Sequence, residues 1–336
     1  MALAERSNKS RSLKSGIPAV ILAALTLIFI AACGQKFDLP PQPEPGRLPE
    51  PGTYNLFTIW PMEAPTDIAV RGSYIFVIQN ESELSAYLSY RKDVAPATVI
   101  EPFNGLIQPV RIAIAKRDST FVIVADKGDM TIKRYFYLGG DPVHTFTDST
   151  WVEFSGLTAD AYLNVYIADA TRDSILVYDD QGHFKRLLSD RGTGSGYVIA
   201  PHGLDHNGDM VIVADTEKNW VQRLDPDTTN IALFSRPIGL DVDLLAPFDV
   251  AADPNAEFIF VADTQVKNDT LTCTRVLKFL TTGAFEDTVY TATKIDLNFP
   301  IIAPSFVASW NDLDADFVYV SDPLGNRVVV LQLVSQ

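Results

Sequence analysis

The chain has 336 residues, 47% of them hydrophobic and 21% charged, and its formal net charge at pH 7 is −15. A chain of this length and composition can bury a large core. The acidic balance repels nucleic acid phosphates and anionic lipid headgroups, so the composition argues against a nucleic-acid function.

The first 35 residues have the layout of an export signal. Four basic residues between positions 6 and 14 precede an apolar stretch at residues 17–30, which is shorter than the about 20 residues that a membrane-spanning helix needs. The run from Ile30 to Cys33 resembles a bacterial lipobox, which implies cleavage before Cys33 and lipidation of its thiol. A plain signal peptide and a single anchor helix are the alternatives.

We therefore expect residues 1–32 to be a lipoprotein signal peptide. Their removal deletes four basic residues and one acidic residue, which lowers the net charge to −18. Gly34 stands where an Asp would favour retention in the inner membrane, so we expect an outer-membrane anchor in the envelope of a Gram-negative host, on the periplasmic side or on the surface. A Gram-positive host would change that inference.

A proline-rich segment follows the expected lipid anchor. Residues 38–52 contain six prolines and no apolar periodicity. Such stretches adopt extended polyproline II and act as semi-rigid spacers. We expect residues 33–53 to form the lipidated cysteine and its tether, and residues 54–336 to form the folded domain.

From Tyr54 onward the sequence predicts only strands, arranged in repeats. Runs of β-branched and aromatic residues end in Ala-Asp or Ser-Asp at intervals of 43, 46, 48 and 59 residues, and a degenerate copy, Tyr74 to Gln79, precedes them. A short segment after Pro or Ser opens each repeat, and a third and a weaker fourth strand follow each run. The five aspartates are Asp126, Asp169, Asp215, Asp263 and Asp322. Short strands at this spacing indicate a closed all-β repeat architecture.

Two segments give the repeat a family resemblance. Residues 191–225 run through a glycine-rich start, Pro-x-Gly, a short polar turn, an apolar strand ending in Ala-Asp, an Asn and a further apolar strand. Residues 322–328, DPLGNRV, have the same Asp-x-x-x-Asn-Arg-Val step. Both segments resemble NHL repeats, which form four-stranded β-propeller blades, usually six to a ring. The six copies here therefore imply a six-bladed β-propeller.

The two ends of the domain predict how the ring closes. The chain ends in Val328 to Leu333, the third strand of the sixth blade, so that blade lacks its outer strand. The alternating segment Tyr54 to Trp60 precedes the first inner strand and can supply it. This 3+1 closure removes an exposed sheet edge.

Each of the five repeat aspartates has a structural role in this interpretation. An Asp carboxylate accepts backbone N–H groups in the turn that follows it, and an Arg such as Arg327 can pair with it. The alternative is that aspartates collected near one face bind a cation or sugar hydroxyls.

The starts of the inner strands carry the candidate binding residues. Asp67, Arg111, His202 and Asp249 fall at these positions and converge on the mouth of the axial channel. They can bind a small polar ligand or a peptide terminus, or they can form a hydrated plug of paired side chains. The insertion at residues 264–274 is expected near the same face.

Other motifs lack the context that their chemistry needs. The glycine-rich residues 191–196 lack the helix and the Lys-Ser/Thr of a phosphate loop. Residues 205–209 and 312–316 lack the Gly and Glu of a helix-loop-helix calcium site, which leaves hairpin turns. His202 by itself cannot build the zinc site that the related amidating lyases hold on their axis. We expect no cofactor, although the acidic turns could bind a divalent cation.

Two functions remain open at this point. The first is a non-catalytic, lipid-anchored module that binds protein, peptide or glycan on the propeller faces. The second is an exported enzyme, a lyase or lactone hydrolase, with its site at the mouth of the axial channel. Fold resemblance does not separate them, because function depends on sites rather than on scaffolds.

Overall fold

The computed structural model describes residues 53–72, 74–80, 82–88, 97–98, 101–116, 120–227, 236–238, 243–267, 270–291, 301–302, 304–312 and 315–334. The chain divides into two units, residues 1–45 and 46–336, and all of the described residues belong to the second unit. The predicted signal peptide, Cys33 and the proline-rich residues 38–52 lie outside the described residues. Among the described residues, no helix has the length and apolar character needed to cross a membrane.

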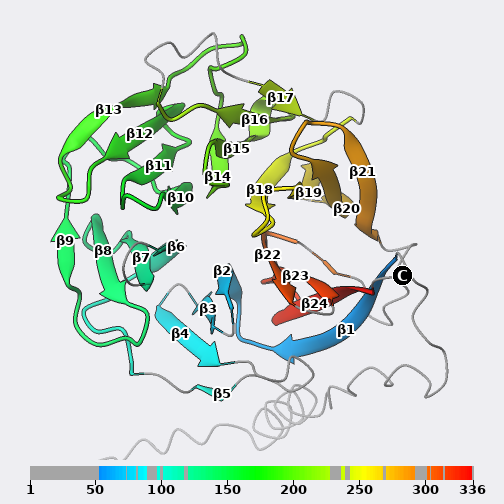
Figure 1. The fold of residues 1–336 in the computed structure, drawn as a ribbon, viewed down its shortest axis with the longest axis horizontal. Coiled ribbons are helices and arrows are strands. Elements are labelled where there is room, and N and C mark those ends of the chain that lie inside the picture. Colours follow the sequence, from blue (N-terminus) through cyan, green and yellow to red (C-terminus); the bar gives the residue numbers. More distant parts are fainter. Residues whose placement is uncertain are drawn as a thin grey trace, which may run out of the picture. The chain divides into compact units, whose positions relative to one another are not determined.

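The second unit is built from six antiparallel sheets of four strands each, arranged around a common axis (Figure 1). We number these sheets as blades 1 to 6 in chain order and give their strands from the axis outward. Blade 1 is β2 (Pro65–Arg71), β3 (Tyr74–Gln79), β4 (Glu83–Leu88) and β5 (Ala97–Thr98); blade 2 is β6 (Pro109–Lys116), β7 (Thr120–Asp126), β8 (Thr131–Phe136) and β9 (His144–Phe146); blade 3 is β10 (Gly156–Ala159), β11 (Val165–Asp169), β12 (Ser174–Tyr178) and β13 (Phe184–Ser189).

The other three blades follow the same order. Blade 4 is β14 (Pro201–His206), β15 (Val211–Asp215), β16 (Trp220–Leu224) and β17 (Arg236–Ile238); blade 5 is β18 (Pro247–Ala252), β19 (Phe258–Lys267), β20 (Thr270–Leu280) and β21 (Phe285–Thr291); blade 6 is β22 (Phe306–Asp312), β23 (Ala315–Asp322), β24 (Arg327–Val334) and β1 (Tyr54–Pro61). The prediction of a six-bladed β-propeller is confirmed.

Blade 6 closes the ring with strands from both ends of the domain. β1 pairs antiparallel with β24, from Tyr54 opposite Leu333 to Pro61 opposite Arg327. Figure 1 shows β1 running along the outside of this blade and leading inward to β2. The 3+1 closure predicted from the unassigned segment at residues 54–60 is therefore confirmed.

The hydrophobic core lies between the blades. The described buried residues form six apolar clusters, one at each contact between neighbouring blades. The cluster between blades 6 and 1 contains Trp60 of β1, which is fully buried, together with Ile75 and Tyr319. Second strands such as β15 (VIVAD) are buried on both faces, which explains why they appear as continuous apolar runs rather than as alternating patterns.

Candidate functional site

The five repeat aspartates are fully buried; four of them end their second strands, and Asp263 lies within β19. The Asp126 carboxylate accepts hydrogen bonds from the backbone amides of Ile107 and Gln108, both at 2.7 Å, and from Gly128 at 3.0 Å. Lys133 Nζ donates to it at 2.6 Å. Asp126 therefore connects the loop before the inner strand to the turn after the second strand. Burial opposes ionisation of this carboxyl, but the hydrogen bonds outweigh it and lower the pKa of Asp126.

The same contacts recur in the other four blades, with partners that vary. In each blade the carboxylate accepts an amide from the loop before the inner strand. These pairs are Asp169 with Val152, Asp215 with Ile199, Asp263 with Leu245, and Asp322 with Ile302. Their polar side-chain partners include Gln222 on Asp215, Arg275 on Asp263 and Arg327 on Asp322. The sequence indicated the turn and Arg327, but it did not indicate the preceding loop.

A cavity of about 530 Å³ lies on the axis and is lined by the inner strands of all six blades. We call it the axial cavity. It extends along these strands from Asp67, Arg111 and Asp249 to Arg71 and Pro254. Its size is typical of sites that bind small molecules.

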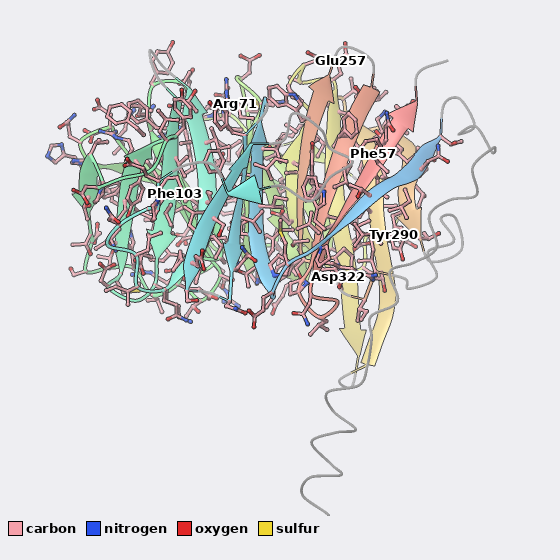
Figure 2. All side chains as sticks on the ribbon, turned by 90° about the horizontal axis from the view of Figure 1, so that it is seen from below. Phe57, Arg71, Phe103, Glu257, Tyr290 and Asp322 are labelled. Atoms are coloured by element: carbon pink, nitrogen blue, oxygen red, sulfur yellow. The ribbon has the colours of Figure 1, made fainter. Side chains whose placement is uncertain are left out.

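The axial cavity reaches the face that carries the hairpins between the first and second strands, which we call the opening face. Arg71 and Pro254 belong to these hairpins and line the cavity. Figure 2 shows Arg71 and Glu257 on this opening face, whereas Asp322 lies on the opposite side, the aspartate face. The inner strands begin at the aspartate face, so their first residues lie at the deep end of the cavity.

Aromatic contacts lie across the deep end of the cavity. The His202 ring packs at a tilt against Phe248 at 4.7 Å between centroids, and Phe248 packs edge-on against Phe306 at 5.5 Å. The Arg111 guanidinium lies 4.5 Å from the centroid of Phe306. Arg111 belongs to blade 2 and Phe306 to blade 6, and blade 1 lies between these two blades in the ring (Figure 1). We call these four side chains the aromatic belt. Arg111 and Phe306 also line the cavity, and we call this end of the cavity its floor.

Three aspartates of the axial cavity connect one inner strand to the next. Asp67 Oδ2 accepts the amide of Ile112 at 2.8 Å, Asp205 Oδ2 accepts that of Ala252 at 2.8 Å, and Asp249 Oδ2 accepts that of Val307 at 2.9 Å. Each bond joins neighbouring blades and satisfies a backbone N–H that the inner strand does not pair within its own sheet.

These aspartates hold protons more strongly than ordinary carboxyls. Burial raises the pKa of Asp67 to about 7 and that of Asp205 to about 6, against the effect of the amides that donate to them. Burial also raises the pKa of Asp249 well above its usual value, and the negative charge of Asp67 adds to this shift. Because the two carboxyls disfavour each other's ionisation, they do not both carry a full charge at neutral pH.

Arg111 is held by backbone carbonyls rather than by the carboxyls beside it. Its Nε donates to the carbonyl of Ser155 in blade 3 at 2.7 Å, and Nη1 donates to that of Val110 at 2.7 Å. Within the part of the chain that the structure describes, Arg111 forms no ion pair, and its Nη2 has no hydrogen-bond partner. The guanidinium is therefore fixed in position with one nitrogen still able to donate.

Of the four residues predicted at the channel mouth, three line the axial cavity. Asp67, Arg111 and Asp249 all line it, at the end nearer the aspartate face. His202 is the second residue of its inner strand, whereas Asp67, Arg111 and Asp249 are the third residues of theirs. Its ring belongs to the aromatic belt, and its Nδ1 contacts the Ala200 carbonyl at 3.0 Å and Thr216 Oγ1 at 3.1 Å. Burial lowers the pKa of His202.

The insertion predicted at residues 264–274 lies on the face where the inner strands begin, which is the face that the sequence predicted for it. It extends the β19–β20 hairpin beyond Asp263, with Lys267 opposite Thr270 at its end. Figure 2 shows this hairpin projecting past Asp322 on the aspartate face. It is therefore on the opposite side from the opening face.

Sequence reasoning missed two residues of the cavity. Asp205 resembled the first ligand of a calcium loop and was assigned to a turn, but it belongs to β14 and bonds to blade 5. Phe306 follows Pro304 at the same interval as Asp67 follows Pro65, so the repeat alignment could have identified it.

The oxygen donors of the cavity do not assemble a metal site. Among the described residues, no group of three or more His, Cys, Asp or Glu side chains is positioned to hold a metal ion. The Asp67 and Asp249 oxygens that accept amides from neighbouring blades also lie beside the Arg111 guanidinium, whose charge disfavours a cation.

The architecture defines the class of this protein, a six-bladed β-propeller. Comparison of the sequence with protein-family models and with curated proteins found no match. Among solved structures, the chain is similar to one in the crystal structure of a nidogen/laminin complex, with a TM-score of 0.54 and 16% identity over 76% of this chain and 92% of that one. It is also similar to a protein of unknown function from Bacteroides caccae, with a TM-score of 0.52 and 12% identity over 73% of this chain and 85% of that one. At these identities the likeness concerns the fold.

Proposed function

We propose that the protein is a lipid-anchored binding module of the cell envelope, an NHL-type propeller that holds a protein, peptide or glycan without transforming it. The observation that carries the proposal is the axial cavity, a concavity of about 530 Å³ with a guanidinium and two protonatable carboxyls at its deep end. A concave site with a few convergent polar groups is the usual form of a ligand site.

Two further features support an interaction role. The similar propeller in the nidogen/laminin structure was crystallised in a protein complex, and this chain has the same fold. The lipobox-like run ending at Cys33 and the proline-rich residues 38–52 suit a domain held at a distance from a membrane. Both faces of such a domain remain accessible to partners.

Recovery of a partner from native membranes tests the binding role. The full-length protein, expressed in its own host and solubilised with mild detergent, should retain one partner or small ligand through purification. A Cys33→Ser variant should move from the membrane fraction to the soluble fraction, which tests the anchor separately. Repeated failure to recover any partner or ligand from membranes that contain the anchored protein would contradict the binding role.

One observation favours the alternative of an exported lyase or lactone hydrolase. Carboxyls with strongly raised pKa values in a cavity are typical of catalytic acids as well as of binding sites. Metal analysis of the purified protein, combined with assays on simple lactones, separates the two functions. A stoichiometric divalent ion together with turnover that Asp249→Asn abolishes would favour the enzyme.

A further inference from the structure

The deep end of the axial cavity presents hydrogen-bond donors. Arg111 provides a permanent positive charge, is fixed by the Ser155 and Val110 carbonyls and by the Phe306 ring, and keeps Nη2 free within the described part of the chain. Asp67 and Asp249 flank it without forming ion pairs with it among the described residues. A carboxyl that holds its proton is an O–H donor.

A ligand that suits this end must therefore accept hydrogen bonds and carry negative charge. A guanidinium binds a carboxylate through charge-assisted hydrogen bonds, which are stronger than neutral ones. Here the guanidinium is already oriented by two backbone carbonyls, so binding costs little reorganisation. We propose that the axial cavity binds a small ligand through its carboxylate group, which enters from the opening face and accepts hydrogen bonds from Arg111 at the floor. The inference rests on the proposed binding function and specifies its ligand chemistry.

The surrounding charges determine how this binding responds to pH. The titratable or charged residues that line the cavity or the belt are Asp67 and Arg71 of β2, Arg111 of β6, His202, Asp205 and His206 of β14, and Asp249 and Asp253 of blade 5. Burial lowers the pKa of both histidines, so they are neutral above about pH 6.5. Above that pH the charge of the cavity changes through the acids alone, and their ionisation repels a carboxylate. Affinity should therefore fall as the pH rises.

The test compares acids with their neutral counterparts. The probes are N-acetyl-trialanine with a free C-terminus and the same peptide as its C-terminal amide, measured by calorimetry on the full folded protein. Methyl glucuronide and methyl glucoside form a second pair, which shows whether the carboxylate is a peptide terminus or a sugar acid. We expect at least one acid to bind at about pH 6, at least about tenfold more tightly than its neutral counterpart, and to weaken by about tenfold at about pH 8.5.

Substitutions at Arg111 test whether the floor of the cavity binds the acid probe. Arg111→Gln should weaken acid binding by at least about tenfold, and Arg111→Lys, which keeps the charge, should weaken it less. Lys127→Gln makes the same charge change at an exposed site on the aspartate face and should leave binding unchanged. Arg111 also bonds to blade 3, so the fold of each variant is checked by circular dichroism.

Asp249→Asn replaces the ionisable carboxyl with a neutral amide of similar shape, and so tests the effect of the negative charge. One amide oxygen can still accept the Val307 N–H, and the amide nitrogen is a permanent neutral donor. The amide nitrogen cannot accept a hydrogen bond, whereas the carboxyl accepts the Val250 N–H as well, so the fold of this variant is also checked by circular dichroism. This variant should bind the acid probe at about pH 8.5 better than the wild type does. The inference is overturned if no acid binds, if acid and neutral probes bind alike, or if Arg111→Gln binds as well as the wild type. In these cases, recovery of a membrane partner equally by wild type and Arg111→Gln would preserve the broader binding role.

Discussion

At the residue scale, aspartate serves two structural purposes in this propeller and only one of them was visible in the sequence. The five repeat aspartates recur at a regular interval, and local rules for Asp and turns predict their contacts. The aspartates of the inner strands bond instead to the next blade, 45 to 58 residues away. No local pattern encodes such a partner, which is why Asp205 was mistaken for part of a turn.

The contacts of Asp126 predict a large loss of stability when it is removed. Asp126→Ala leaves three backbone amides without their acceptor and removes the buried partner of Lys133. We expect the free energy of unfolding to fall by about 3–5 kcal/mol, measured by urea denaturation. Asp129→Ala is the matched control, because Asp129 binds the same lysine but its side chain is 32% exposed. Asp129→Ala should lower the free energy of unfolding by less than about 1 kcal/mol. Equal losses in the two variants would contradict the structural role of the buried Asp126 carboxylate.

The raised pKa values of the cavity acids predict how stability depends on pH. The pKa is about 7 for Asp67 and about 6 for Asp205, and it is raised for Asp249, so the folded state retains protons that the unfolded chain releases near pH 4. Stability from these groups is complete below about pH 4 and is lost as the pH rises through the folded values. His202 and His206, with lowered pKa values, act in the opposite direction only below about pH 6.5.

The free energy of unfolding should therefore fall between about pH 6.5 and pH 8, when measured by urea titration at each pH. Asp249→Asn should flatten this decline and exceed the wild type at about pH 8 by an amount on the order of 1 kcal/mol. Stability that rises across the same interval, or a variant with the wild-type slope, would show that these carboxyls are ionised in the folded protein.

At the element scale, the inner strands of blades 4 and 5 leave no room for a side chain at Gly203. A Cβ atom at this position would overlap Oδ1 of Asp249 and crowd its backbone. Gly203→Ala should therefore cost about 1–3 kcal/mol in thermal or urea unfolding. Gly194→Ala is the control, because its Cβ would meet Tyr197 at an ordinary 3.6 Å. We expect Gly194→Ala to change the free energy of unfolding by no more than about 0.5 kcal/mol. A comparable loss in both variants would contradict the tight packing of Gly203 against Asp249.

The strand β1 should be required for a closed ring. Deleting residues 1–61 removes Trp60 from the cluster between blades 6 and 1 and exposes the edge of β24. We expect the melting temperature to fall by on the order of 10 °C or more and the protein to self-associate in sedimentation experiments. Deleting residues 1–52 leaves β1 intact and should preserve a stable monomer. If both truncated proteins behave alike, β1 does not close the ring in solution.

At the scale of the whole molecule, the fold was predictable because each repeat has residues that mark where its strands begin and end. Pro or Ser before the inner strand, apolar runs ending in Asp, and the unassigned segment at residues 54–60 together specified six blades and their closure. The contact between Arg111 and Phe306 was not predictable. These residues belong to blades 2 and 6, and strand patterns carry no information on contacts across a ring.

The axial cavity as a carboxylate site is the central claim, and a crystal structure with the bound probe tests it most directly. The wild-type protein would be crystallised at about pH 6 with the acid probe that binds in calorimetry, beside a crystal grown with its neutral counterpart. The account predicts density for a carboxylate within hydrogen-bond distance of Arg111 Nη2, and none for the neutral probe at that position. An acid probe bound elsewhere on the propeller, with only solvent beside Arg111, would contradict it.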